Sequence, residues 1–328
     1  MPDRALIADA RTRLSSRSSV SFVTSWTSVD MLTGPQRLFL ADRTYSYAVL
    51  RQFNSRLHAV WNWLSHNLFH LVLSSIYRLY EHNLDRRVRA CAMPRHIGLI
   101  LDGNRRYSRN NRVVDPHEVY MVGADKLDEL LEWCIALKIP AITLWVLSTE
   151  NLKRPREEVS GILSAIEKKL AVLANDPQIH NGRVRVRAVG RLGSLPQSTL
   201  AAIHTAVEAT QDYDGMQLTI AAAYGGREEI IDAMQSMLRE QLAQNRSLQD
   251  VIEMITPEAV ARSLYAPDLP DPDLIIRTSG EIRLSGFLLW QSAFSEFYFT
   301  DVFWPAFRRI DFLRALRAFQ QRQRRFGK

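Results

Sequence analysis

The 328-residue chain has only two cysteines, Cys91 and Cys134, and its cysteines and histidines lack the spacing of a metal site. Two cysteines give no disulfide framework, so we expect a reducing compartment, the cytoplasm. The Gly-x-x-x-x-Gly-Lys-Ser/Thr loop of P-loop proteins and internal repeats are also missing. These absences argue against a small disulfide-stabilised protein, a zinc module and a P-loop nucleotide-binding protein.

The composition is that of a globular protein, with 46% hydrophobic and 23% charged residues. The formal net charge of +7 suits anionic partners such as diphosphates, acidic lipids or nucleic acid. The arginines gather at the ends of predicted strands beside acidic residues, and not along one face with interleaved aromatics. We therefore expect no nucleic-acid partner.

The N-terminal part differs from the rest of the chain. Residues 1–50 are poor in periodicity and rich in Ser, Arg and Thr, which predicts a disordered extension. Residues 51–92 are expected to form a helical extension. Its segment 57–77 lacks Asp, Glu, Lys and Arg, yet carries eight His, Asn and Ser residues. Three interpretations stay open: a helix packed on the main domain or on a second copy, a peripheral membrane contact through 57–80, or a membrane span.

Strand and helix patterns alternate from residue 93 to residue 328, which predicts one α/β domain. Its sheet is expected to be mainly parallel, six-stranded and flanked by helices. Helical periodicity is clear in 127–137, where apolar residues recur on one face. The predicted strands are 97–101, 142–147, 184–189, 218–222, 274–276 and 296–299.

The first strand runs directly into polar residues with a distinct chemistry. Asp102 is a hard oxygen ligand of the kind that Mg²⁺ prefers, and Gly103 permits close approach of a ligand to the backbone. Arg105 and Arg106 offer planar, permanently charged forks for phosphate oxygens. The alternative is an ordinary turn with solvated arginines.

Two further strand ends favour the first interpretation. The strand at 142–147 is followed by the polar, cationic run 148–155, and the strand at 274–276 by a loop with two arginines and two serines. Ligands of open α/β sheets lie beyond the carboxyl ends of such strands. The sequence therefore predicts a site for phosphate and a metal ion at this edge of the sheet.

Several long motifs resemble those of the cis-prenyltransferase family, the undecaprenyl diphosphate synthase-like proteins. The chain is also similar to the short-chain Z-farnesyl diphosphate synthases within that family. The matching motifs are His-Ile-Gly-Leu-Ile-Leu-Asp-Gly-Asn-Arg-Arg (96–106), Ser-Thr-Glu-Asn-Leu-Lys-Arg-Pro (148–155), Ala-Tyr-Gly-Gly-Arg-Glu-Glu-Ile (223–230), Asp-Pro-Asp-Leu-Ile-Ile-Arg-Thr-Ser-Gly-Glu (271–281), Leu-Ser-Gly-Phe-Leu-Leu-Trp-Gln (284–291) and Ser-Glu-Phe-Tyr-Phe-Thr-Asp-Val-Phe-Trp-Pro (295–305).

The resemblance implies a Mg²⁺-dependent enzyme that joins isopentenyl diphosphate to an allylic diphosphate, and it implies a homodimer. The expected product is a short Z-configured isoprenyl diphosphate, such as Z,E-farnesyl diphosphate. The alternatives are a long-chain undecaprenyl diphosphate synthase and, remotely, a non-catalytic partner subunit, although such partners lack the Asp-Gly-Asn motif that stands here at 102–104.

Roles carried over by motif position give the candidate site. The implied catalytic residues are Asp102, Asn104, Ser148 and Asn151, and Asp102 and Glu296 are the implied metal-associated carboxylates. The segment 325–327 resembles an Arg-x-Gly tail that reaches the isopentenyl diphosphate across the dimer. The implied substrate-binding residues are Gly103, Asn104, Arg105, Arg106, Ser148, Thr149, Glu150, Arg154, Arg277, Arg283, Ser285, Arg325 and Gly327.

Three positions depart from the long-chain members of the family. Tyr120 stands where those enzymes usually place a histidine near the allylic diphosphate. Leu130 and Leu131 fall in a helix that resembles the wall of the product tunnel, where long-chain relatives often keep a small residue. Because bulk in a packed wall yields little, we expect these two leucines to limit the product length.

Overall fold

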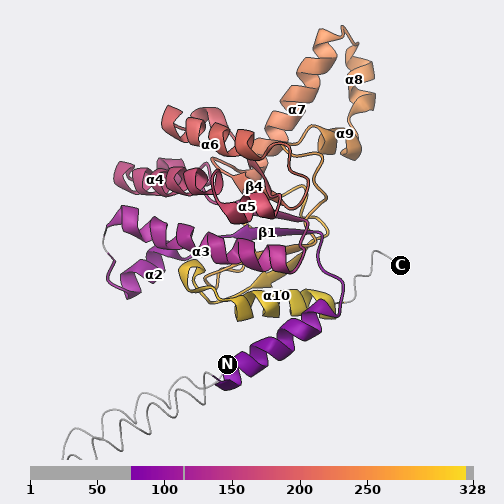
Figure 1. Ribbon diagram of the computed structural model, residues 1–328. Helices are drawn as coiled ribbons and strands as arrows, with labels where there is room; N and C mark the ends of the chain where they lie inside the picture. Colours follow the sequence, from indigo (N-terminus) through magenta and orange to yellow (C-terminus); the bar gives the residue numbers. More distant parts are fainter. Residues whose placement is uncertain (1–74, 114, 323–328) are drawn as a thin grey trace, which may run out of the picture. The chain divides into compact units, whose positions relative to one another are not determined.

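The computed structural model describes residues 75–113 and 115–322, and its six strands form one parallel sheet of order β3-β4-β2-β1-β5-β6 (Figure 1). This confirms the expected α/β fold. Every residue of the central strand β1 is buried, which explains the apolar run that follows His96. The strands are β1 (His96–Ile100), β2 (Ala141–Trp145), β3 (Arg185–Val189), β4 (Gln217–Ala221), β5 (Leu274–Arg277) and β6 (Glu296–Phe299).

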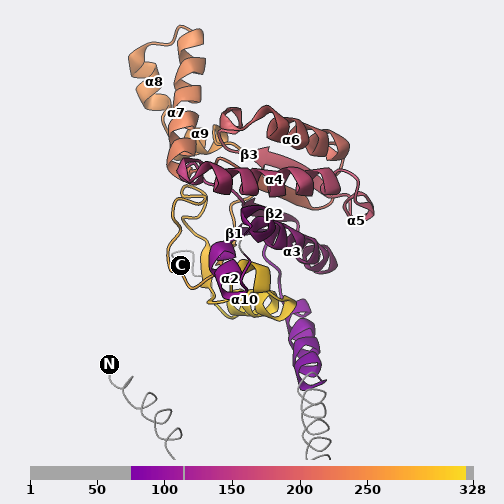
Figure 2. The same cartoon turned by 90° about the vertical axis from the view of Figure 1, so that its left-hand side faces the viewer.

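Helices connect the strands, and α3, α4 and α6 lie side by side over one face of the sheet (Figure 2). In both views α7 and α8 project away from the sheet. The helices are α2 (Asn104–Asn110), α3 (Pro116–Ala136), α4 (Arg156–Leu173), α5 (Pro177–Asn181), α6 (Gln197–Thr210), α7 (Gly226–Ala243), α8 (Leu248–Met254), α9 (Pro257–Arg262) and α10 (Arg309–Gln321), with short 3₁₀ helices η1 (Asn151–Lys153), η2 (Leu192–Ser194) and η3 (Trp304–Ala306).

The start of α3 follows ordinary helix-capping chemistry. The Asp115 side chain accepts a hydrogen bond of 2.9 Å from the His117 amide, and a proline occupies the first turn. The helix then carries Leu130, Leu131 and Cys134 into the hydrophobic core beneath the sheet. Capping and periodicity together fix which faces of α3 are available to line a site.

A helix over residues 75–89 lies against α10. Arg309 of α10 pairs with Glu81 at 3.1 Å and with Asp85 at 2.6 Å, and the buried Leu84 and Val88 join the core. This helix coincides with the last part of the expected helical extension at 51–92. The expected disordered segment 1–50 and the uncharged segment up to residue 74 lie outside the described residues. No helix of the described part is long and apolar enough to cross a membrane.

Candidate active site

The carboxyl ends of β1, β2 and β5 border a cavity of about 1150 Å³, between these strand ends and helices α3 and α4. This volume exceeds the roughly 300–1,000 Å³ of most small-molecule sites. Polar and charged residues gather at the strand ends, while the part between α3 and α4 is mainly apolar. The cavity therefore suits a ligand with a charged head and an apolar tail.

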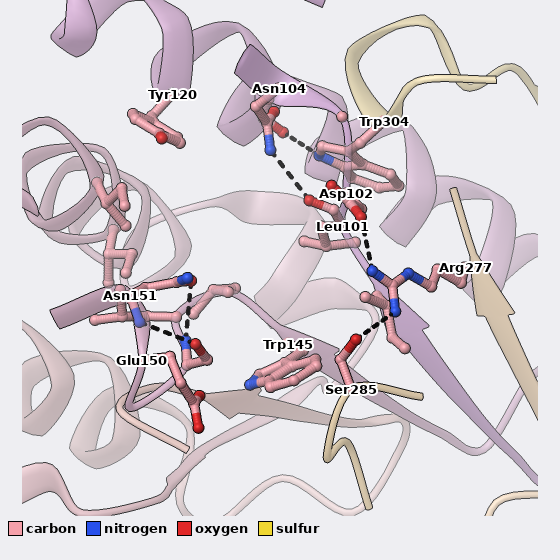
Figure 3. A pocket seen from close by; sticks show the side chains of 18 of the residues that line it. Leu101, Asp102, Asn104, Tyr120, Trp145, Glu150, Asn151, Arg277, Ser285 and Trp304 are labelled. Carbon is pink, nitrogen blue, oxygen red and sulfur yellow. Dashed lines mark hydrogen bonds and ion pairs between the residues drawn. The ribbon is translucent and has the colours of Figure 1, made fainter. Parts of the chain in front are cut away.

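The end of β1 places Asp102 in this cavity through a turn that only glycine can make. Gly103 has a φ of 104°, and a Cβ there would lie 2.8 Å from the Phe303 ring and 2.9 Å from Ser279. Asp102 thus leaves the strand with its carboxylate free to face β5. Figure 3 shows Asp102, Arg277 and Ser285 joined in a row.

Arg277 is the cation at the centre of this row. It ends β5, is 4% exposed, and donates from Nη2 to Asp102 Oδ2 at 2.9 Å. Its Nη1 donates to Ser285 Oγ at 2.8 Å and to the Arg283 carbonyl at 2.5 Å. The structure therefore brings Asp102, Arg277 and Ser285 together with the backbone of Arg283, whose own guanidinium pairs with Glu281.

The charge state of Asp102 follows from these neighbours. Burial alone raises the pKa of the Asp102 carboxyl. The hydrogen bond and the charge of Arg277, helped by Arg106, outweigh burial and hold that pKa below its usual range. Asp102 is consequently a carboxylate at neutral pH and can serve as an oxygen ligand.

The first turn of α2 adds further cations beside Asp102. Arg106 Nη2 lies 3.7 Å from Asp102 Oδ1, and its Nη1 lies 3.3 Å from Glu281 Oε1. The guanidinium also stacks over the Phe303 ring, 5.7 Å from its centre. These contacts hold Arg106 at the mouth of the cavity, where an anion can reach it.

The side-chain amide of Asn104 makes a hydrogen bond through its nitrogen but not through its oxygen. Its Nδ2 donates to the Leu101 carbonyl at 3.1 Å, whereas its buried Oδ1 has no hydrogen-bond partner. Gly123 of α3 faces this oxygen at close range. A buried acceptor without a partner is costly, so this oxygen is a candidate for contact with a ligand.

Residues after β2 line the opposite side of the cavity (Figure 3). Asn151 Oδ1 accepts from the Ser148 amide at 3.2 Å, and the Asn151 amide donates to Ser148 Oγ at 3.0 Å. Glu150 joins them in the lining, while the hydroxyl of Thr149 donates to Glu150 at 3.2 Å. Thr149 is not part of the lining, so the structure does not place its side chain in the site.

Glu158 is a functional candidate that our reading of the sequence missed. Its Oε1 accepts hydrogen bonds from Tyr120 at 2.7 Å and from Arg154 at 2.9 Å, and Arg105 Nε lies 3.6 Å away. The spacing of Arg154 and Glu158, four residues apart at the start of a helix, is the signal that was available. Glu158 thus sets the positions of three side chains at the cavity wall.

Two groups of expected site residues do not line the cavity. Glu296 begins β6 and lies in register with Leu274 and, through β5, with Ile97, whereas Asp102 follows the end of β1. Glu296 pairs instead with Arg322 at 2.5 Å. Glu296 stands at the amino-terminal end of β6, whereas Asp102 lies beyond the carboxyl end of β1. The two carboxylates are therefore not neighbours within one chain.

The second group is the pair of leucines expected in the wall of the product tunnel. Leu130 and Leu131 are 0% and 2% exposed, belong to the hydrophobic core and do not line the cavity. The residues of α3 that line it are Tyr120, Gly123, Ala124 and Leu127. Arg325 and Gly327 lie outside the described residues, so their expected role across a dimer stays a prediction.

The donor set fits Mg²⁺ if substrate oxygens complete it. Among residues 75–113 and 115–322, no three His, Cys, Asp or Glu side chains form a group that could hold a metal. Mg²⁺ is commonly held in proteins by one or two carboxylates together with phosphate oxygens and water. The ionised Asp102, surrounded by arginines, matches that arrangement with a diphosphate.

Fold and site together define an α/β protein whose cavity suits a molecule with an anionic head and an apolar tail. The family model described as undecaprenyl diphosphate synthase matches residues 100–327. The chain belongs to this family of prenyltransferases, the cis-prenyltransferases.

Named relatives agree with this assignment. The isoprenyl transferase of Deinococcus radiodurans is 56% identical over 250 residues, which cover 76% of this chain and 91% of the relative. The (2Z,6E)-farnesyl diphosphate synthase of Thermobifida fusca is 49% identical over 252 residues, 77% of this chain and 97% of the relative. The crystal structure of lavandulyl diphosphate synthase from Lavandula x intermedia, in complex with dimethylallyl diphosphate, matches 72% of this chain and 99% of its own, with a TM-score of 0.66 and 31% identity.

Proposed function

We propose that this prenyltransferase condenses isopentenyl diphosphate with an allylic diphosphate in a Mg²⁺-dependent reaction and releases a short Z-configured isoprenyl diphosphate, such as Z,E-farnesyl diphosphate. One observation carries the proposal: a single cavity joins the Asp102–Arg277–Ser285 row to an apolar wall between α3 and α4. The similarity to a (2Z,6E)-farnesyl diphosphate synthase, 49% identical, fits the short product, and that to the undecaprenyl diphosphate synthase of Methanopyrus kandleri, 48% identical, fits the long-chain alternative.

The reaction demands charge stabilisation above all. The allylic C–O bond breaks and the diphosphate leaves with both bonding electrons. The alkene of isopentenyl diphosphate then attacks the allylic carbon, and a proton is lost from the new chain. Mg²⁺ bound at Asp102 would neutralise part of the departing charge. Arginine guanidiniums held in place before the reaction stabilise that charge without reorganisation.

Each group of side chains has a part in this scheme. Gly103, Arg105 and Arg106 surround the leaving diphosphate beside Asp102, and Arg154 supports them through Glu158. Asn104, Ser148 and Asn151 lie close to the reacting carbons. Arg277, Arg283 and Ser285 bind the diphosphate group of isopentenyl diphosphate.

The test is incubation of the purified protein with labelled isopentenyl diphosphate, Mg²⁺ and allylic primers of five, ten or fifteen carbons. We expect label to appear in short isoprenyl diphosphates, and we expect Asp102→Ala to lose turnover while remaining folded. A lack of incorporation with every primer would refute the activity. Products of undecaprenyl length would favour the long-chain alternative, which the name of the family model supports.

We also propose that the protein acts as a homodimer. Large apolar side chains are exposed along the projecting helices α7 and α8, and such contiguous exposure is typical of an interaction surface. These residues are Ile231 (50% exposed), Met234 (39%), Leu238 (42%), Leu242 (76%), Leu248 (76%) and Ile252 (56%). A monomeric mass in light scattering at micromolar concentration would contradict the dimer.

A peripheral membrane contact through 57–80, in a cytoplasmic protein, is the remaining part of the proposal. At the described end of this segment, Ile76 and Leu79 are 58% and 62% exposed. Arg78, Arg86 and Arg87 are exposed on the same helix and suit anionic lipid headgroups. Flotation with anionic vesicles tests it, and a protein that stays at the bottom of the gradient contradicts it.

A further inference from the structure

The inner part of the cavity lies between α3 and α4 and contains one charged side chain. Lys169 of α4 is 7% exposed and lines the cavity among apolar neighbours. Its neighbours in the lining are Leu127, Ile162, Ala165, Ile166, Leu170 and Leu173, each at most 9% exposed. A buried ammonium costs free energy unless it is paired, so its position on this wall calls for an explanation.

Lys169 lies far from the residues assigned to the chemistry. Helix α4 begins after the polar loop that follows β2, close to Arg154, and its early residue Glu158 contacts Tyr120. Lys169 comes about three turns later, roughly 16 Å along the axis at about 1.5 Å per residue. The intervening wall is apolar, as a growing isoprenoid chain requires.

The ammonium of Lys169 is tied to the facing helix. Its Nζ donates to Asp128 Oδ1 of α3, and this contact crosses the seam between α3 and α4. The Asp128 side chain is 45% exposed, so the pair lies where the cavity wall meets solvent. The pair therefore joins the two helices part of the way along the apolar wall, which continues to Leu173, and it places two charges at the seam between them.

We infer that the Lys169–Asp128 ion pair limits the length of the isoprenyl chain that this enzyme makes. The inference rests on the proposed function, and it replaces Leu130 and Leu131 as the source of the limit. Each added unit moves the apolar end of the product further along α4. At Lys169 that end meets an ammonium, and further growth must separate the pair or strip water from a charge. Roughly 16 Å of wall accommodates a few isoprene units and not an undecaprenyl chain.

The experiment compares three substitutions on the full-length enzyme, with chromatography of the products made from labelled isopentenyl diphosphate. Lys169→Met keeps the length of the side chain and removes its charge, and we expect products longer by one or more isoprene units. Lys169→Arg retains the charge and is expected to keep the wild-type distribution. Lys168→Met is the matched control, because Lys168 is exposed on the same helix.

The outcomes separate this inference from the proposed function. An unchanged distribution in an active Lys169→Met enzyme overturns the inference and leaves the function standing. A wild-type enzyme that incorporates no isopentenyl diphosphate overturns the function instead. If Lys169→Met fails to fold by circular dichroism, Lys169→Leu, which also removes the ammonium, decides, with longer products supporting the inference and unchanged products overturning it.

Discussion

The close contact between Gly123 and Asn104 makes a sharp prediction about the catalytic role of Asn104. A Cβ built on Gly123 lies 2.2 Å from Asn104 Oδ1 and 3.2 Å from the Trp304 ring. Non-bonded atoms in well-packed interiors stay roughly 3.5 Å apart, so Gly123→Ala must push the Asn104 amide away by about 1 Å. A displacement of that size in an active site costs about 10²-fold in rate. We therefore expect the kcat of Gly123→Ala to fall about 10²-fold.

Stability should change little in the same variant. Alanine is favoured over glycine inside a helix by roughly 0.5–1 kcal/mol. Loss of the 3.1 Å hydrogen bond from Asn104 to the Leu101 carbonyl costs about 1 kcal/mol and offsets that gain. The free energy of unfolding, measured with urea, is thus expected to stay near its wild-type value.

Gly193→Ala is the control, because a Cβ at Gly193 meets nothing within 4 Å. Initial rates of isopentenyl diphosphate incorporation at saturating substrates measure kcat for both variants. A Gly123→Ala enzyme with wild-type kcat would refute the assignment of Asn104 to the reacting centre. A loss of several kcal/mol in stability would show that the added methyl disturbs the packing around Trp304 instead.

Three further outcomes are expected. Leu130→Ala lowers the free energy of unfolding by about 2–5 kcal/mol, because it opens a cavity in the core, and leaves the product length unchanged; a longer product would restore Leu130 to the tunnel wall. Chelation of divalent ions abolishes incorporation and added Mg²⁺ restores it, whereas turnover in excess EDTA would exclude the metal role of Asp102. Burial lowers the pKa of His96, whose Nδ1 donates to the Pro270 carbonyl and whose Nε2 accepts from Thr143. The unfolded chain then binds a proton that the folded one does not, so the wild type loses stability as the pH falls below about 6.5, by up to about 1.4 kcal/mol per pH unit relative to His96→Gln. The free energy of unfolding in urea, measured at several pH values, checks this. The same pH dependence in both proteins would contradict it.

The fold could be predicted from the sequence because its strands are buried on both faces. The predicted strand 296–299 matches β6, and 274–276 falls one residue short of β5, whose last residue is Arg277. That Asp102 and Arg277 lie at the same edge of the sheet could also be predicted, whereas their direct contact depends on β1 and β5 being neighbours in the sheet. Residues at corresponding ends of parallel strands meet whatever the loops between them do.

The remainder depended on facts that periodicity does not contain. The predicted strand 296–299 already places Glu296 at the start of its strand, away from Asp102, but the role of Glu296 comes from the motif comparison, which carries no positional information. The helical pattern of α3 marks Leu130 and Leu131 as apolar, and apolar residues line core and cavity alike. The contact of Lys169 with Asp128 joins residues from two helices whose relative placement only the folded chain shows.

The pairing of arginines with carboxylates at the cavity mouth makes the site selective among anions. Each of these arginines is paired with a carboxylate of the protein: Arg277 with Asp102, Arg106 with Glu281, and Arg154 with Glu158. An anionic ligand must therefore compete with these carboxylates for the guanidiniums. A chloride ion or a monoester with little charge gains too little from that exchange. A diphosphate, with several charged oxygens that engage guanidiniums in bidentate fashion, gains enough. A site built in this way discriminates against abundant small anions while it stays open to diphosphates.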